Sequence, residues 1–205
     1  MIFKRKWKSY YLKERIMINI KPVLHLMICV SMLMSFSVKA QNVIKSPRGY
    51  SPQIGTTVSM LEDLKKRVTN SVVNLTMEET DYLLDEDANR IGAMIMHLAA
   101  TEKYYQLYTF ENRGFDDDEK EWEMALNLGL IARDSIQNKP ISYYLEIWDE
   151  VRKETLRLLK TQDDKWFAAN VKESNMNNHW AWYHVMEHQA NHMGQIRLII
   201  KRIDH

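Results

Sequence analysis

Cysteine is almost absent from this chain, and the one that occurs, Cys29, lies in a leader that we expect to be removed. A chain cut after residue 40 would contain no disulfide, no catalytic thiol and no thiolate ligand for a metal. Any metal site must therefore be built from histidines and carboxylates.

Glycine and proline are also scarce, with 6 and 4 residues among 205. The sequence has no alternating strand pattern of any length, no glycine-rich phosphate loop and no internal repeat. These absences argue against a β fold and against nucleotide-binding loops, and they leave helices as the main elements.

The first 40 residues have the composition of a secretory signal peptide. A long basic stretch precedes an apolar run from Val23 to Val38, and Ala40 offers a small residue at the cleavage position. The run of about 16 residues is shorter than the ~20 needed to span a bilayer, so a transmembrane anchor is the weaker alternative. We expect export to the periplasm or the extracellular space, with Met17 as an alternative start of translation.

Removal of the leader makes the chain acidic. The leader holds 8 of the 28 Lys and Arg residues and 1 of the 27 Asp and Glu residues, which leaves 20 basic and 26 acidic residues and a net charge near −6. Such a charge argues against nucleic acid and anionic membranes as partners. We expect a small-molecule substrate and no membrane anchor after processing, and a homodimer stays open.

Four segments show the apolar spacing of amphipathic helices, over residues 56–75, 87–110, 140–162 and 178–204. An acidic loop over 112–121 and a shorter helical segment over 119–135 separate the second from the third. The pattern predicts an all-α fold, an antiparallel four-helix bundle over residues 56–205 with an acidic insertion. Residues 41–55 are expected to form an extended entry segment.

The last helix carries three histidines at four-residue spacing, His184, His188 and His192. With His184 at 0° on a helical wheel, the other two fall at about 40° and about 80°, on a stripe that also holds core-facing apolar residues. Asn191 and Gln195 fall on the same stripe. A buried polar row is costly unless each member has a partner, and a metal ion would supply one for the imidazoles.

Two peptidase motifs fit this helix poorly. His188 and His192 have the HExxH spacing, but Gln189 replaces the general-base glutamate. The inverted HxxEH form matches residues 184–188, yet Glu187 points well away from His188 on the wheel, and only Asp204 remains as a downstream acidic ligand. A third arrangement combines His188 and His192 with His97 of the second helix.

This third arrangement carries a resemblance. The chain resembles the DinB/YfiT-like family of metal-binding four-helix bundles over most of residues 56–203. Three segments carry the resemblance: HLAATEKY around His97, EHQANHMGQI with two histidines before x-Gly-Gln, and KPISYYLEIWDEVRKETL. The resemblance implies a three-histidine site for a divalent metal, zinc or nickel, with His97, His188 and His192 as ligands. His184 matches a histidine often seen one turn earlier in the family, which we expect either to support the ligands from behind or to line the pocket.

A three-histidine site leaves the charge of the ion intact, so a bound water could become a nucleophile near neutral pH. We therefore expect an exported metal-dependent hydrolase of a small ester or amide. Glu187 and Glu102 are the candidate acid/base groups, and Asn191 and Gln195 are candidates to orient the imidazoles. A non-catalytic metal-binding or stress-related bundle and a thiol-transferase-like enzyme are the alternatives.

Overall fold

The computed structural model of the chain describes residues 43–203, and the predicted signal peptide lies outside this range. Within it, the chain forms helices and connecting segments without a β-strand; the nearest approach to one is an isolated bridge between Asn170 and Asn177. The predicted all-α class is confirmed. No helix of this range combines the length and the apolar character needed to cross a bilayer.

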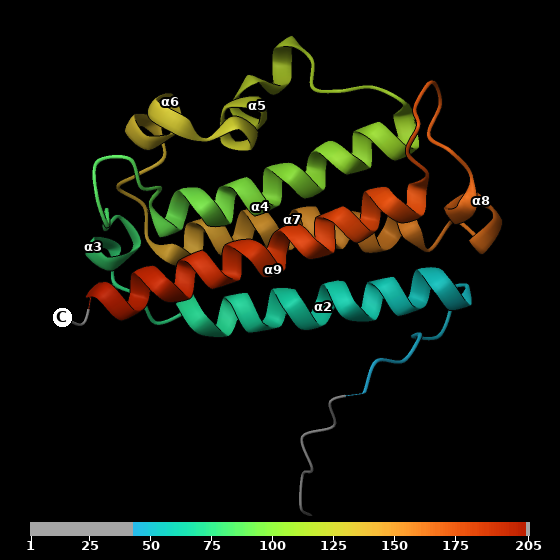
Figure 1. Ribbon diagram of the computed structural model, residues 1–205, viewed down its shortest axis with the longest axis horizontal. Helices are drawn as coiled ribbons and strands as arrows, with labels where there is room; N and C mark the ends of the chain where they lie inside the picture. Colours follow the sequence, from blue (N-terminus) through green and yellow to red (C-terminus); the bar gives the residue numbers. More distant parts are fainter. Residues whose placement is uncertain (1–42, 204–205) are drawn as a thin grey trace, which may run out of the picture. The chain divides into compact units, whose positions relative to one another are not determined.

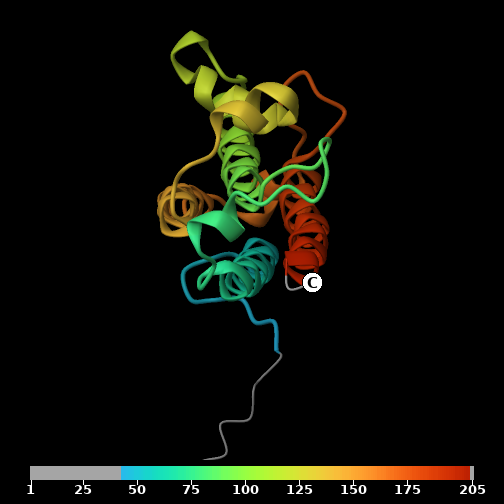
Figure 2. The same cartoon turned by 90° about the vertical axis from the view of Figure 1, so that its left-hand side faces the viewer.

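Four long helices pack side by side (Figure 1), and seen end-on they occupy the corners of a quadrilateral (Figure 2). They are α2 (Pro52–Val72), α4 (Ile91–Gln106), α7 (Ile141–Leu159) and α9 (Asn178–Ile203). Each packs against two others, so that the order around the bundle is α2, α9, α4, α7. These helices agree with the four predicted segments to within a few residues at most ends.

The directions of the helices differ from the predicted antiparallel arrangement in two of the four neighbouring pairs. Helices α4 and α7 run the same way, because Gly92 packs on Tyr144 near their starts and Gln106 donates to the Val151 carbonyl further along. Helices α2 and α9 are also parallel, and Arg197 reaches Ser71 near their ends. The α4–α9 and α2–α7 pairs are antiparallel.

The parallel α4–α7 pair requires a connection that returns along the length of the bundle. This connection contains the predicted acidic loop and α5 (Lys120–Asn127) and α6 (Gly129–Ser135), which lie over α4 (Figure 1). The predicted single helix over 119–135 is broken at Leu128, whose φ of 54° cannot continue a right-handed helix. The connection thereby places the backbone of α5 against the middle of α4.

Short elements complete the chain, and side-chain caps begin two of its helices. Helix α3 (Met77–Thr80) begins with a capping box in which Thr76 and Glu79 satisfy each other's backbone N–H groups. Helix α4 ends in a wider π-helical turn over Leu107–Glu111, and α8 (Asp164–Ala168) precedes the loop into α9. The Asn177 side chain accepts from the Trp180 N–H at 2.8 Å and so caps α9.

Candidate metal centre

The antiparallel contact between α4 and α9 brings together the three predicted ligands. One ring nitrogen each from His97, His188 and His192 lie within 4.8 Å of one another. The Nε2 atoms of His97 and His188 are 2.6 Å apart, and the ring centroids are separated by 4.6 to 4.8 Å. Two helices therefore converge on one point with three imidazoles.

A backbone contact from the insertion fixes the orientation of His97. Its Nδ1 lies 3.0 Å from the carbonyl oxygen of Ala125 in α5. A carbonyl can only accept, so Nδ1 carries the proton and the Nε2 lone pair faces His188. Histidine ligands commonly donate their second ring N–H in this way, which fixes the tautomer that a metal needs.

Burial makes all three imidazoles weak bases. It lowers the pKa of His97, and it lowers the pKa of His188 to about 3 and that of His192 to about 4, with the neighbouring histidines adding to the shift. The rings are therefore neutral near pH 7, with lone pairs available to a cation.

The unpaired ring nitrogens of the cluster also fit a divalent cation. The Nδ1 atom of His192 is buried without a hydrogen-bond partner, and two Nε2 atoms meet at a distance at which two lone pairs would repel. A cation bound by the three rings would remove such repulsion. An all-imidazole donor set suits zinc, nickel, copper and iron better than magnesium or calcium.

His184 lies one turn before His188 and outside the three-nitrogen cluster. Its ring stacks on Trp180, with the centroids 5.1 Å apart and the planes at 5°, and it meets the edge of Tyr105 at 5.8 Å. Its Nδ1 lies 3.4 Å from Glu187 Oε2. The structure thus places His184 beside Trp180 and Tyr105, and Tyr105 meets the Tyr104 ring at 5.5 Å; we call these four rings the aromatic wall.

The buried face of α9 is rotated from the predicted stripe. Gln189, at about 140° on the same wheel, is as buried as the core residue Val185, whereas Asn191 and Gln195 are exposed. Leu198, further along the same helix, is 50% exposed. The histidines therefore lie at the edge of the core and not at its centre.

The polar helpers on α9 lie at the surface beside this edge. Asn191 contacts the Glu187 carboxylate at 3.5 Å and makes no hydrogen bond to an imidazole, whereas the Gln195 side chain acts to raise the pKa of His192 against the effect of burial. Glu187 keeps an accessible carboxylate, with 44% of its side chain exposed.

Glu102 has an environment that argues against the predicted acid/base role. It is fully buried, and its oxygens accept from Arg152 at 2.7 and 2.8 Å and from Trp148 Nε1 at 3.0 Å. Burial alone would raise its pKa, but the Arg152 guanidinium and these hydrogen bonds hold the pKa below its usual range. A carboxylate that is ionised, enclosed and fully engaged cannot exchange protons with a substrate.

Two contributors to the site region were missed from the sequence. Gln189, treated only as a missing glutamate, is 1% exposed, and its amide lies 3.4 Å from Glu102, which ties the residue after His188 to α4. Its place on the buried face of the wheel could have identified it. The Ala125 carbonyl has no sequence signal, because every residue carries one.

The fold and the cluster define a helical protein whose three neutral histidines are placed to bind a divalent metal ion. A comparison with protein families matches residues 56–205 to the family described as MST, mycothiol-S-transferase. The chain belongs to this family, which is part of the DinB/YfiT-like superfamily, so the resemblance drawn from the motifs is confirmed. No curated protein matched the chain.

Proposed function

We propose that this protein is a metal-dependent S-transferase that joins the sulfur of a small thiol to an electrophilic carbon. The observation that carries the proposal is the set of three neutral imidazole nitrogens within 4.8 Å of one another. The family match supports transfer to or from a thiol. Residues 43–203 contain no cysteine, so the nucleophilic sulfur must come from the substrate.

His97, His188 and His192 would hold the ion, with His97 oriented by the Ala125 carbonyl. Zinc or nickel remain the metals that we expect. When bound, a divalent cation lowers the pKa of a thiol or water molecule that reaches it. Neutral ligands leave the charge of the cation undiminished, which favours the anionic form of the sulfur.

The protons can be balanced with residues of this chain. The thiol R–SH loses its proton, its sulfur forms a bond to the electrophilic carbon of R′–X, and X⁻ leaves with the pair of electrons from the broken bond. Glu187 is the candidate acceptor of the thiol proton, because its carboxylate is 44% exposed and lies 3.4 Å from His184, one turn from His188. The proton then passes to X⁻ or to solvent.

The aromatic wall offers a surface for the electrophile. Trp180 is 47% exposed and Tyr104 is half-buried, so both have ring surface that a substrate could cover. Trp182, in contrast, is fully buried and belongs to the core. An electrophile with a planar or apolar group fits this wall better than a highly charged one.

Hydrolysis of a small ester or amide is the second candidate. It is favoured by the predicted export signal, since low-molecular-weight thiols are cytoplasmic substrates and water is available in every compartment. A cation held by the same three histidines would then lower the pKa of a water molecule, and Glu187 would accept the proton of that water.

One experiment separates the two activities. The full chain is loaded with zinc or nickel and assayed with chlorodinitrobenzene plus a panel of small thiols, and separately with p-nitrophenyl acetate. The variant His188→Ala is compared with His179→Ala, a matched control on the same helix whose ring stacks on Phe167 away from the cluster. We expect chelator-sensitive thiol consumption that His188→Ala abolishes and His179→Ala retains.

Thiol consumption that survives both chelation and His188→Ala would overturn the proposal. Metal-dependent ester hydrolysis without any thiol consumption would replace it with the second candidate. Absence of both activities, together with stoichiometric metal, would favour the non-catalytic metal-binding bundle.

A further inference from the structure

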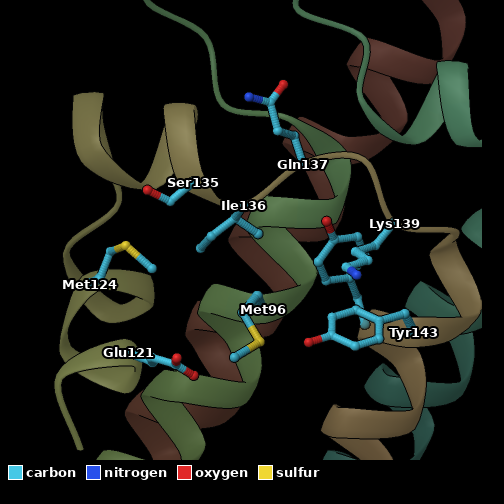
Figure 3. Close-up of a pocket in the computed structure, with 9 residues that line it drawn as sticks. Met96, Glu121, Met124, Ser135, Ile136, Gln137, Lys139 and Tyr143 are labelled. Atoms are coloured by element: carbon cyan, nitrogen blue, oxygen red, sulfur yellow. The ribbon is translucent and has the colours of Figure 1, made fainter.

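A cavity of about 210 Å³ lies between the segment before α4, α4 itself and the last turns of α9. We call it the α9 cavity. It differs from the cavity drawn in Figure 3, of about 280 Å³, which lies between α4, α5 and the start of α7. The walls of that other cavity carry charges of opposite sign, Glu121 and Lys139, and none of the three histidines lines it. The α9 cavity is the one that adjoins the histidine centre.

Two lining residues place the α9 cavity one helical turn from the ligands. Gln195 follows His192 by three residues, and Met94 precedes His97 by three, which is a rise of about 4.5 Å along each helix. Because α4 and α9 are antiparallel, both steps lead toward the same end of the helix pair. The Gln195 side chain also acts to raise the pKa of His192 against the effect of burial, so it lies close to that ring. A molecule in this cavity would therefore lie beside a bound metal ion.

The α9 cavity, the histidines and the aromatic wall follow one stripe of α9. On the wheel with His184 at 0°, the cavity residues Gln195, Leu198 and Ile199 fall at about 20°, 320° and 60°, and the three histidines span about 0–80°. Trp180 of the aromatic wall falls at about 320°. The histidine centre thus has the wall on one side and the α9 cavity on the other. Two substrates can approach it from opposite ends of the stripe.

The lining of the α9 cavity is uncharged and mostly apolar. Asn89 and Gln195 are its polar members, and the others are Leu84, Ala88, Met94, Leu198 and Ile199. Leu84 and Leu198 are exposed, so a ligand could cover apolar surface that now faces water. Three exposed carboxylates, Asp85, Glu86 and Asp87, directly precede Ala88 and would repel an anion. The cavity therefore favours an uncharged hydrocarbon group.

The segment that forms one wall of this cavity is held in place by α6. Arg133 donates from its two Nη atoms to the carbonyls of Glu86 and Asp87, at 2.6 and 2.8 Å. The Asp85 carboxylate accepts from the Asp87 N–H at 3.0 Å. A preformed wall reduces the entropy that a ligand loses on binding. The volume equals that of about seven molecules of liquid water, which is room for a chain of about six carbon atoms.

We infer that the α9 cavity binds the hydrocarbon body of the thiol substrate, and that this substrate is a small apolar thiol. The inference rests on the proposed S-transferase function. A thiol whose sulfur reaches the three histidines extends its chain past Gln195 over Met94 and Leu198, and the aromatic wall is left to the electrophile. The length and the polarity of the chain then determine which thiols are accepted.

The test measures thiol binding to the cobalt-loaded full chain, because a thiolate bound to cobalt gives a charge-transfer band in the near ultraviolet. Ethanethiol, propanethiol and butanethiol are titrated, with 2-methoxyethanethiol as a polar analogue of butanethiol. We expect the Kd to fall about two- to fourfold for each added CH₂, fourfold being the value for complete burial. The polar analogue should bind more weakly than butanethiol.

Two variants change the cavity without touching a histidine. Ala88→Phe fills it, and Leu198→Ser removes apolar surface, so both should weaken the dependence of the Kd on chain length. Leu130→Ser is the matched control, because Leu130 is exposed on α6 and does not line the cavity. If Ala88→Phe fails to fold, Leu198→Ser still decides, since position 198 is exposed.

A second measurement uses the metal-free full chain and butanol, followed by ligand-observed NMR. We expect butanol to bind to the wild type and to Leu130→Ser, and binding to be lost in Ala88→Phe. Equal Kd values for the three alkanethiols would overturn the inference, while the band itself would still support thiol binding at the metal. Absence of the band with every thiol would contradict the proposed function. Butanol binding that Ala88→Phe abolishes would in that case assign the cavity to a substrate other than a thiol, which also overturns the inference.

Discussion

The buried ion pair between Glu102 and Arg152 allows a quantitative prediction for Glu102→Gln. The substitution keeps the size of the side chain but removes its charge, and Arg152, 3% exposed, then lacks its main counterion. Breaking a buried pair in this way costs about 3–5 kcal/mol. We expect the lower end, about 3 kcal/mol, because Arg152 also donates to the Leu61 carbonyl and to Glu62 at 2.9 Å.

Urea unfolding followed by far-UV circular dichroism, on metal-free protein, measures this loss. For a domain of this size the midpoint should fall by about 1–2 M and Tm by about 6–12 °C. Glu150→Gln is the matched control, because its partner Lys153 is 77% exposed and the loss should stay below about 0.5 kcal/mol. A loss below about 1 kcal/mol for Glu102→Gln would refute the reasoning.

The same carboxylate predicts a pH dependence. The pKa of Glu102 is lower in the folded than in the unfolded chain, where it has the ordinary value of 4.5. The folded state therefore binds fewer protons, and the ion pair stabilises the protein fully above the unfolded pKa. Its contribution is lost as the pH falls below about 4.5 through the folded value, and Glu102→Gln should flatten this acid limb of the stability curve.

Three further predictions follow from single contacts. His188→Ala should remove bound metal, measured by elemental analysis, while helical circular dichroism stays at the wild-type level; full metal retention would contradict the ligand assignment. Gly92→Ala should lose about 1–3 kcal/mol, since the added Cβ would lie 2.5 Å from the Tyr144 ring, and an unchanged Tm would disprove that packing. Thr76→Ala should lose about 1 kcal/mol with its capping box, and a urea titration that shows no loss for this variant would contradict the role of the hydroxyl.

Most of the fold could be predicted because its signals are local. Apolar spacing located the four long helices, and their ends agree with the structure to within a few residues. The directions of the helices could not be read from spacing, which is the same for a helix that runs up or down. The long connection between α4 and α7 was the available signal, since parallel neighbours need a crossover of that length.

The candidate site was partly predictable for a related reason. His97, His188 and His192 could be grouped because their spacing and motif are local to two helices. The role of Glu102 could not, because its partner Arg152 lies on another helix. The phase of α9 was misjudged because the polar residues near the cluster obscure which face is apolar.

The contact between His97 and the Ala125 carbonyl has a consequence for how such a centre changes over time. The hydrogen bond that orients this ring is accepted by a main-chain carbonyl, so it does not depend on which side chain occupies position 125. This hydrogen bond depends instead on the length of the connection between α4 and α7 and on how that connection packs on α4. Insertions and deletions in this connection, and not point substitutions, are therefore the changes by which evolution or an engineer would alter the orientation of His97 and the affinity for a metal ion.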